Sequence, residues 1–276
     1  MSAVGYRKSL QNVGFVLALV AAACNQAAVS SQRLINVGQR KLFINCSGQR
    51  HGPAVILESG MGESSDSWSK VQPEIARLTE VCSYDRAGFG KSTPLAAPLS
   101  VSADETIQDL HSLLKGAAIS PPYVLVGASA GGIFVRRFTS KYPDEVKGMV
   151  LADSAHEEQL WRFLDIDATV IQGVSLKPDD IRRMGFLPPR ERFTWHDDIP
   201  LIVLQHGVPI PMHGSAEKHQ AEFEAAKHSM QQDLAGRSRY GELRTAEHSG
   251  HRIWLEQPDM VIQAIKDVLD RVSRKQ

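Results

Sequence analysis

Ser129, the serine of a Gly-x-Ser-x-Gly pattern, is the residue of this sequence best suited to covalent chemistry. A serine hydroxyl is a weak nucleophile, and it becomes reactive when a base takes its proton and N–H groups bind the oxyanion that forms. The base in turn needs a third group that orients it. Short turns rich in glycine and serine are common, so the pattern alone also fits a strand–turn–helix without chemistry. The rest of the chain must therefore supply a base, an acid and oxyanion donors.

The residues around Ser129 predict how it is positioned. Residues 123–126 form an apolar run typical of a buried parallel strand, and residues 133–142 are compatible with a helix. A sharp strand-to-helix turn would place the serine at its apex, at the carboxyl edge of a sheet. Gly127 and Gly131 suit such a turn, because side chains there would clash across it. The free N–H groups at the start of the helix would then face a reacting oxygen.

The remaining chain alternates between strand and helix patterns. Apolar or alternating runs predict further strands at residues 33–37, 41–46, 54–58, 81–84, 146–152, 199–205 and 242–246. Amphipathic or polar segments predict helices at residues 68–78, 104–117 and 216–234, and from Pro258 onwards. This order predicts an α/β fold with a mostly parallel central sheet flanked by helices, formed as one domain by residues 31–276.

Residues 154–198 break this alternation. They contain two helix-like pieces, at residues 157–163 and 178–184, and several aromatic residues. An excursion of this length between strands is usually functional. We therefore interpret it as a small helical lid over the Ser129 edge, although its aromatic residues could also serve only its own packing.

Composition and local motifs exclude several kinds of partner. The formal net charge of zero offers no basic surface for nucleic acid. Gly90-Lys91-Ser92 is similar to the end of a phosphate-binding loop, but Asp85 stands where that motif needs glycine. His-Glu-Glu-Gln at residues 156–159 lacks the second histidine of a zinc motif. We therefore expect a small-molecule substrate, with no metal, no organic cofactor and no nucleic acid.

Residues 1–30 differ from the rest. Arg7 and Lys8 precede an apolar run at residues 13–23, which ends in small residues directly before Cys24. This pattern is typical of a signal peptide, and the run is shorter than the ~20 residues that a spanning helix needs. Cys24 after the alanines also resembles a lipoprotein cleavage site. We expect an exported protein that is periplasmic, secreted or anchored to the cell envelope. Anchoring would use a lipidated Cys24, and the alternative to lipidation is an ordinary cleaved signal peptide.

Four motifs, taken in order, resemble those of the α/β-hydrolase superfamily across nearly all of residues 33–272. They are Ser59-Gly60-Met61-Gly62, Tyr84-Asp85-Arg86-Ala87-Gly88-Phe89-Gly90-Lys91-Ser92, Gly127-Ala128-Ser129-Ala130-Gly131-Gly132 and Ser249-Gly250-His251 with Pro258 seven residues later. The resemblance implies an α/β-hydrolase fold. It also implies that Asp85 and Arg86 stand where the family uses an ion pair to hold loops near the nucleophile.

The resemblance assigns a role to each candidate. Ser129 is the expected nucleophile, and His251, on the loop after the last strand, is the expected general base. His248 is a rival for the base, but the Ser-Gly-His context favours His251. The backbone N–H groups of Ala130 and Met61 are expected to form the oxyanion hole. The Met61 side chain has a plainer role available as a pocket wall.

The acid is the harder assignment. Many family members carry it after the penultimate strand, but the corresponding loop here, residues 206–215, contains no Asp or Glu. The other family position follows the strand after the nucleophile helix, where Asp153 stands. We therefore expect Asp153 to be the acid, with Glu157 and Glu158 as weaker candidates. The other histidines, His206 included, are expected to make only surface or supporting polar contacts.

The resemblance also implies a disulfide. Cys46 and Cys82 are the cysteines that remain after the leader, and the family's strand order places the two strands that carry them side by side and antiparallel. Export would supply the oxidising environment, and the alternative is two buried free thiols.

These expectations add up to a serine hydrolase that cleaves a carboxylic ester or related acyl compound through an acyl-enzyme. Amide, lactone, thioester and carbon–carbon cleavage use the same triad and stay open. An aspartate nucleophile would indicate epoxide or haloalkane hydrolysis, so Ser129 argues against both. The alternative from another class is a non-catalytic small-molecule-binding protein on the same fold.

Overall fold

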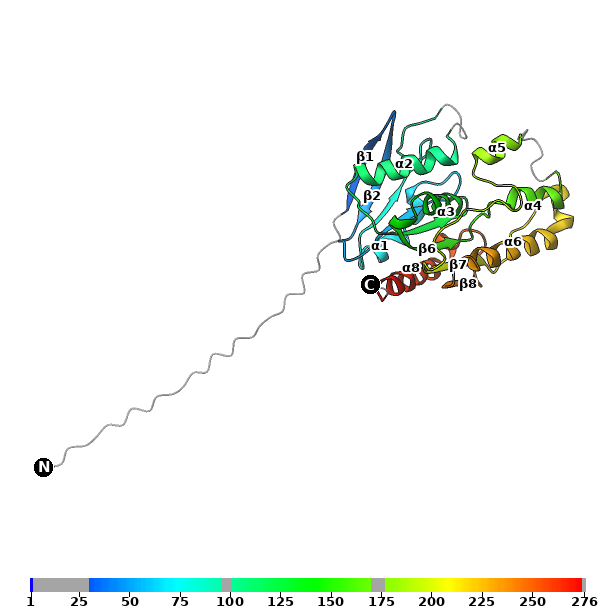
Figure 1. The fold of residues 1–276 in the computed structure, drawn as a ribbon. Helices are drawn as coiled ribbons and strands as arrows, with labels where there is room; N and C mark the ends of the chain where they lie inside the picture. Colours follow the sequence, from blue (N-terminus) through cyan, green and yellow to red (C-terminus); the bar gives the residue numbers. More distant parts are fainter. Residues whose placement is uncertain (2–29, 96–100, 170–176, 275–276) are drawn as a thin grey trace.

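The computed structural model describes residues 1, 30–95, 101–169 and 177–274 of the chain (Figure 1). The expected leader and Cys24 lie outside these residues, as does the central part of the expected lid. Within the described ranges, no helix is both long enough and apolar enough to span a membrane.

The described residues form one eight-stranded sheet, in the order β1-β2-β4-β3-β5-β6-β7-β8. From β4 to β8 every neighbouring pair is parallel, while β2 pairs antiparallel with both β1 and β4. This confirms the mostly parallel central sheet. The strands are β1 (Ser31–Val37), β2 (Arg40–Ser47), β3 (Ala54–Glu58), β4 (Val81–Tyr84), β5 (Tyr123–Ala128), β6 (Val146–Ala152), β7 (Leu201–His206) and β8 (Gly241–Ala246).

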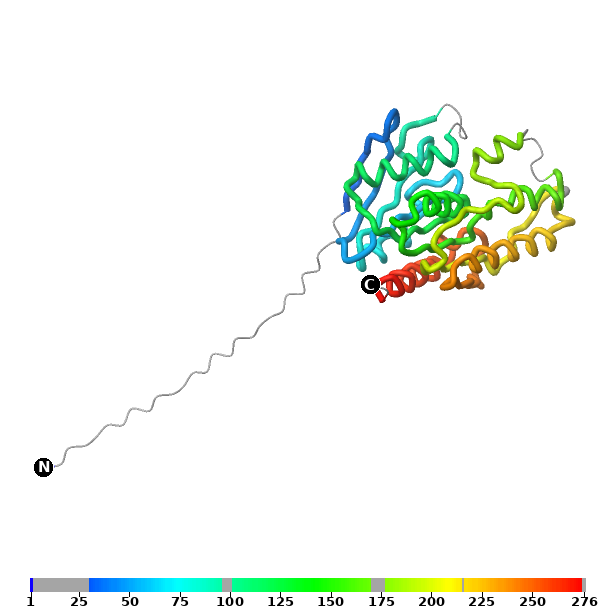
Figure 2. Tube along the Cα trace, in the orientation of Figure 1, coloured from blue at the N-terminus to red at the C-terminus, as the bar shows by residue number. Residues whose placement is uncertain are grey.

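Helices cover both faces of the sheet, because the central strands are apolar on both sides. In β3, Ile56 faces a core built with α2 and α3, whereas Val55 and Leu57 face a second core built with α1 and α8. The α-helices are α1 (Gln72–Ile75), α2 (Ala103–Gly116), α3 (Gly131–Lys141), α4 (Gln159–Ile166), α5 (Pro178–Arg183), α6 (Gln220–Ala235), α7 (Ile253–Glu256) and α8 (Pro258–Ser273), and the 3-10 helices are η1 (Ser65–Trp68), η2 (Pro143–Glu145) and η3 (Gly214–His219). In Figure 2 the blue hairpin of β1 and β2 lies at one end of the molecule, and the yellow and orange α6 lies at the other.

Two predicted helices are shorter than expected. The predicted helix at residues 68–78 is replaced by η1 and the four-residue α1. Pro73 lies in the first turn of α1, and its missing N–H and its ring prevent a helix from continuing through it from the preceding residues. The predicted helix at residues 216–234 begins at Gln220, and η3 precedes it.

The segment between β6 and β7 carries α4 and α5. Its aromatic residues pack against the sheet domain as well as among themselves. Phe193 shares a small core with Ile133 of α3, and Phe163 of α4 meets Phe223 of α6 edge to face, with ring centroids 5.0 Å apart. This packing joins the described parts of the segment to α3 and α6.

Candidate active site

Ser129 occupies the turn between β5 and α3. Its φ of 52° lies in the left-handed region, which a non-glycine residue adopts only where the surroundings enforce it. The chain approaches itself closely at this turn, since a Cβ on Gly127 would lie 2.6 Å from the Cα of Gly132. A Cβ on Gly131 would lie 2.5 Å from the carbonyl oxygen of Glu58. The two outer glycines of the motif therefore allow the turn to pack against β3 and its own helix.

His251 faces Ser129 from the loop after β8. Its Nε2 lies 2.9 Å from the Ser129 Oγ, within hydrogen-bond distance. Glu256 holds this loop by accepting hydrogen bonds from the Ser249 hydroxyl and the Gly250 N–H, at 3.1 and 2.7 Å. The ring of Trp254 packs edge to face on the His251 ring, with centroids 5.7 Å apart.

Of the two candidate bases, the structure brings His251 to the serine and not His248. His248 is exposed, and it is its backbone N–H that is engaged, donating to the side chain of Gln257.

Asp153 completes the line of side chains. It follows β6 directly, and its Oδ2 lies 2.6 Å from the Nδ1 of His251. Its φ of 39° is again left-handed, which turns the carboxylate toward the neighbouring loops. Burial acts to raise the pKa of Asp153, but hydrogen bonds from His206 and His251 outweigh it and hold the pKa well below its usual range. The carboxylate is thus a buried, stable anion.

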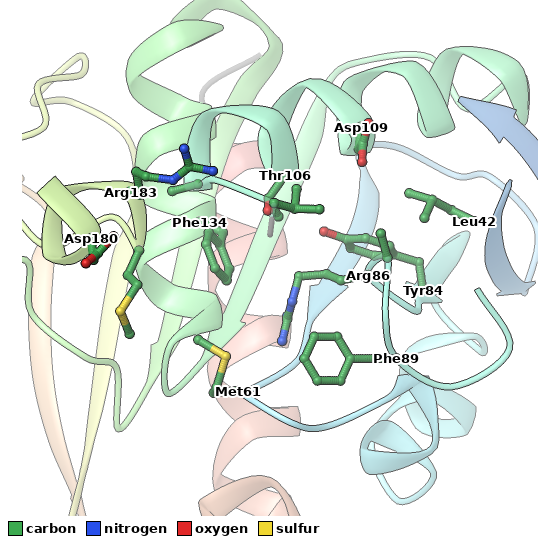
Figure 3. A pocket seen from close by; sticks show the side chains of 14 residues that line it. Leu42, Met61, Tyr84, Arg86, Phe89, Thr106, Asp109, Phe134, Asp180 and Arg183 are labelled. Carbon is green, nitrogen blue, oxygen red and sulfur yellow. The ribbon is translucent and has the colours of Figure 1, made fainter. Parts of the chain in front are cut away.

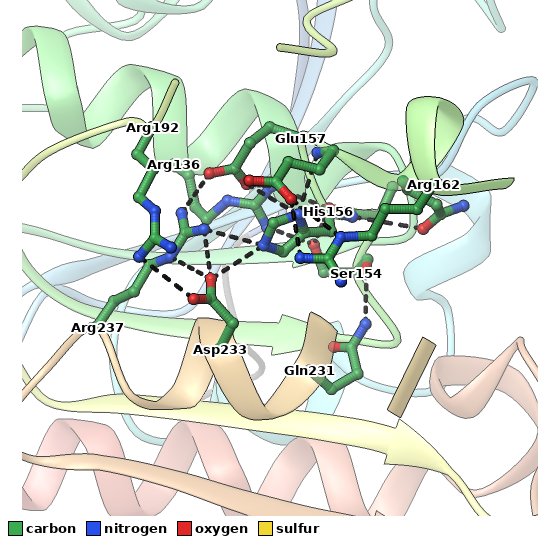
Figure 4. Close-up of polar contacts among 12 residues, drawn as sticks. Arg136, Ser154, His156, Glu157, Arg162, Arg192, Gln231, Asp233 and Arg237 are labelled. Carbon is green, nitrogen blue, oxygen red and sulfur yellow. Dashed lines mark hydrogen bonds and ion pairs between the residues drawn. The ribbon is translucent and has the colours of Figure 1, made fainter. Parts of the chain in front are cut away.

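Glu157 and Glu158, the weaker candidates for the acid, make their ion pairs elsewhere, and Figure 4 shows those of Glu157. Glu157 is fully buried and pairs with Arg136 of α3 and with Arg237, which follows α6. Burial acts to raise the pKa of Glu157, but the charge of Arg136 leads the opposing effects and the pKa is lowered. Glu158 pairs with Arg162 at 2.9 Å and is the N-cap residue of α4. The structure therefore brings neither residue to His251.

The same buried network includes His156. The N–H of Glu158 donates to its Nδ1 at 3.0 Å, and its Nε2 lies 3.0 Å from Asp233 and 2.9 Å from the guanidinium of Arg237. Burial lowers the pKa of His156. This network anchors the start of the α4 segment to α3 and α6.

Two backbone N–H groups near Ser129, those of Met61 and Ala130, are without a hydrogen-bond acceptor among the described residues. The neighbouring N–H of Gly60 is engaged, because it donates to the Glu63 carboxylate at 3.3 Å. A Cβ on Gly60 would lie 3.3 Å from the Cβ of Ser129, so the loop that carries Met61 borders the serine. Ala130 lies at the N-cap of α3, where the positive end of the helix favours negative charge.

Arg86 holds this loop in place. It pairs with the buried Glu58 and donates to the carbonyl oxygens of Ser59 and Gly60. The expected ion pair between Asp85 and Arg86 is not found among the described residues: Arg86 pairs with Glu58, and the Asp85 carboxylate accepts hydrogen bonds from the backbone N–H groups of Ser65 and Lys91. Both residues still support the loops near Ser129, but through different partners.

A pocket opens beside the loop that carries Met61 (Figure 3). Its empty volume is about 800 Å³, which includes space open to solvent. Most of its wall is apolar. The residues that line it are Leu42, Met61, Tyr84, Arg86, Ala87, Phe89, Val101, Ala103, Thr106, Asp109, Phe134, Asp180, Arg183 and Met184. Met61 thus contributes its side chain to the pocket wall, and Asp180 and Arg183 of α5 line another part of it.

His206 makes the supporting kind of polar contact expected for it, but its pairing with Asp153 and Glu224 was not anticipated from the sequence. His206 ends β7, and its Nδ1 lies 2.7 Å from the Oδ1 of Asp153. Its Nε2 lies 2.7 Å from the Oε2 of Glu224, on α6. The sequence does contain a signal for the contact with Asp153. His206 and Asp153 each directly follow a predicted strand, and the ends of neighbouring parallel strands lie at the same edge of a sheet.

Cys46 of β2 and Cys82 of β4 are directly opposite in the antiparallel pair and form a disulfide. Neither cysteine takes part in the contacts of Ser129, His251 and Asp153 or lines the pocket beside Met61, so the bridge supports the sheet. In the part of the chain that the structure describes, no group of three or more His, Cys, Asp and Glu side chains could hold a metal ion.

Comparison with known proteins agrees with this architecture. A family model described as "alpha/beta hydrolase fold" matches residues 53–184. The chain is 30% identical over 222 residues to the uncharacterized protein YqjL of Bacillus subtilis (strain 168), covering 79% of this chain and 83% of that protein.

Solved structures share the fold at low sequence identity. The carboxylesterase CesB of Bacillus subtilis is similar with a TM-score of 0.60 and 18% identity, covering 87% of this chain and 92% of that one. Est816, described as an N-acyl homoserine lactone degrading enzyme, is similar with a TM-score of 0.58 and 17% identity, covering 85% and 99%. Together with the family match and the relative from Bacillus, these findings show that the chain belongs to the α/β-hydrolase fold family.

Proposed function

We propose that the protein is a serine hydrolase that cleaves carboxylic esters through an acyl-enzyme, with Ser129 as nucleophile, His251 as general base and Asp153 as the orienting acid. The observation that carries the proposal is the continuous line from Ser129 Oγ to His251 Nε2 and from His251 Nδ1 to Asp153 Oδ2, at 2.9 and 2.6 Å. The hydrolase family and the fold shared with a carboxylesterase support the reaction class.

In the first half of the proposed reaction, Ser129 Oγ attacks the ester carbonyl carbon while His251 Nε2 takes the hydroxyl proton. The oxyanion accepts hydrogen bonds from the N–H groups of Ala130 and Met61. The bond to the alcohol oxygen then breaks, and His251 returns its proton to the leaving alcohol.

In the second half, water attacks the acyl-enzyme. His251 takes a proton from the water and then gives it to Ser129 as the acid product leaves. Asp153 remains an anion throughout, holding the Nδ1 proton of His251 and stabilising the imidazolium.

The proposed substrate has an apolar acyl or alcohol group. The pocket beside Met61 has a mainly apolar wall, including Phe89, Phe134 and Met184, and such a wall gains binding energy from apolar surface. We also propose, from the leader pattern, that the enzyme acts outside the cytoplasm and that the α4 and α5 segment serves as its lid.

A fluorophosphonate probe combined with two substitutions tests the proposal. We expect the wild-type protein to be labelled on Ser129, and Ser129→Ala to abolish both labelling and ester turnover. His251→Ala should lower kcat by about 10⁴-fold or more, because the triad works as a unit. A panel of p-nitrophenyl esters of increasing acyl length, with a lactone added, would define the substrate.

His248→Ala is the matched control, and we expect it to keep near wild-type activity. If wild type is neither labelled nor active on any compound of the panel, the protein is a binder on a hydrolase fold and the proposal is wrong. If His248→Ala loses activity while His251→Ala keeps it, the base is misassigned.

A further inference from the structure

His206 lies between two carboxylates. Its Nδ1 is 2.7 Å from Asp153 Oδ1, and its Nε2 is 2.7 Å from Glu224 Oε2. Its backbone N–H also points to Asp153 Oδ1, at 3.3 Å. The side chain is only 7% exposed and that of Asp153 only 4%, so water screens the first contact weakly.

The chemistry of these contacts requires a doubly protonated ring. An ionised carboxylate only accepts hydrogen bonds, and a neutral imidazole carries a single N–H. Both short contacts are therefore hydrogen bonds only when His206 is an imidazolium. Burial acts to lower the pKa of His206, but the hydrogen bond and charge of Asp153, together with Glu224, outweigh it and raise the pKa above its ordinary value.

The titratable groups placed around His206 come from three elements. Asp153 follows β6, Glu224 and Lys227 lie on α6, and His251 stands on the far side of Asp153. Burial lowers the pKa of Lys227, while the charges of Asp153 and Glu224 act to raise it. Two carboxylates therefore face two cationic side chains, and the histidine is the one in direct contact with both carboxylates.

We propose that His206, held as a cation by Glu224, is a positioning residue for Asp153: it binds Oδ1 and so leaves Oδ2 turned toward His251. A carboxylate held only by one hydrogen bond to His251 could rotate about its side-chain torsions. The second bond on the opposite oxygen fixes both torsions and keeps the group ionised. The proposal rests on the serine hydrolase function proposed above.

The proposal has a consequence for pH dependence. The cation is present below the raised pKa of His206 and is lost as the pH rises through it. Above that pH the ring is neutral and has one N–H for two carboxylates. Its hydrogen bond to Asp153 then either loses its charge or is broken, and in both cases Asp153 is held less firmly. We therefore expect wild-type kcat to fall on an alkaline limb.

Long-range ¹H–¹⁵N NMR of the histidine rings tests the charge state without any substrate. The titration of wild-type His206, whose signals are identified by their loss in His206→Asn, should have its midpoint above the ordinary histidine pKa of ~6.5. In Glu224→Gln, the midpoint should move to lower pH. A wild-type midpoint at or below the ordinary value, or a midpoint unmoved in Glu224→Gln, would overturn the proposal.

Kinetics test the positioning role. In His206→Asn, the shorter amide can still donate toward Asp153, but it carries no charge and does not reach Glu224. We expect kcat to fall roughly 10- to 100-fold, KM to change less than about twofold, and the alkaline limb to disappear. In Glu224→Gln, the limb should move to lower pH.

Matched controls come from an exposed pair nearby, since His219 Nδ1 lies 2.9 Å from Glu222 Oε1. His219→Asn and Glu222→Gln should leave kcat and the alkaline limb unchanged. If fluorophosphonate labels wild-type Ser129 but His206→Asn and Glu224→Gln keep the wild-type pH profile, the positioning role is wrong while the hydrolase function stands. If wild type is not labelled, the hydrolase function itself fails. Should His206→Asn not fold, Glu224→Gln carries both tests.

Discussion

At the scale of single residues, the site depends on two non-glycine positions with left-handed backbones. Ser129 has a φ of 52° and Asp153 a φ of 39°. Such conformations cost on the order of 1–3 kcal/mol each, and they persist only where surrounding contacts enforce them. Both residues directly follow neighbouring parallel strands. Their left-handed backbone conformations turn a hydroxyl and a carboxylate toward the same histidine.

The first residue-scale prediction concerns the acid. Asp153→Asn should lower kcat by about 10³–10⁴-fold with little change in KM, because an amide cannot stabilise the His251 imidazolium and can favour the wrong tautomer. A helix-capping role for Asp153 would tolerate asparagine, but the N-cap of α4 is Glu158. Steady-state kinetics, with thermal unfolding as the check on folding, measures the effect.

Glu158→Gln is the control for this substitution, since Glu158 pairs with Arg162 and does not contact His251. We expect it to keep most of the activity. Near wild-type turnover in Asp153→Asn would mean that another group orients the histidine.

At the scale of elements, the site depends on how closely α3 approaches β3. The first helical residue, Gly131, lies against the carbonyl oxygens of Glu58 and Ser59, at distances that leave no room for a side chain. The same approach brings the N-cap residue Ala130 beside the loop of Met61. The packing of the helix therefore also sets the spacing of the two N–H groups that we propose as oxyanion donors.

Gly131→Ala tests this property. The new Cβ would lie 2.5 Å from one backbone oxygen and 2.6 Å from another, so α3 must shift. We expect the free energy of unfolding to fall by about 1–3 kcal/mol and kcat to fall as well, because the Ala130 N–H moves with the helix. Urea denaturation and ester kinetics on the same preparation measure both effects.

Gly236→Ala serves as the comparison, because the nearest atoms to its added Cβ are 3.5 Å away and its φ of −67° suits alanine. We expect a change in stability of less than about 1 kcal/mol and no change in kcat. Equal behaviour of the two variants would contradict the close-approach argument.

At the scale of the whole molecule, the disulfide joins the N-terminal hairpin to the parallel part of the sheet. Cys46 lies on β2, the strand through which β1 attaches to the rest of the sheet, and Cys82 lies on β4. The bridge closes a loop with a sequence separation of 36, and loops of this kind constrain the unfolded chain. Its formation is consistent with the proposed export.

The double substitution Cys46→Ser with Cys82→Ser should lower the free energy of unfolding by about 2–4 kcal/mol. We expect kcat at moderate temperature to stay unchanged, because neither cysteine contacts the triad residues or lines the pocket. In wild-type protein exported to the periplasm, alkylation under unfolding, non-reducing conditions should modify neither Cys46 nor Cys82, as peptide mapping would detect. Alkylation of both would show two free thiols and contradict the bridge.

The sequence by itself determined the strand-turn-helix around Ser129, the alternation of strands and helices, and the family to which the chain belongs. These follow from local patterns: an apolar run of strand length, glycines where the turn closes, and amphipathic spacing such as that of α2 and α8. The loop motif around His251 could be recognised equally well, because its contacts are local. Ser249 and Gly250 donate hydrogen bonds to Glu256, which lies only a few residues further along the chain.

Only the tertiary structure decided which polar side chains meet. Glu157 and Asp153 are both carboxylates just after β6, and the difference between them arises because Arg136 and Arg237 from other elements neutralise the former. His206 lies 53 residues from Asp153 along the chain, and its contact exists because β6 and β7 are neighbours in the sheet while α6 brings Glu224 to its other side. Local sequence governs backbone conformation over a few residues, whereas the charge and orientation of a buried group depend on partners that folding brings from distant segments.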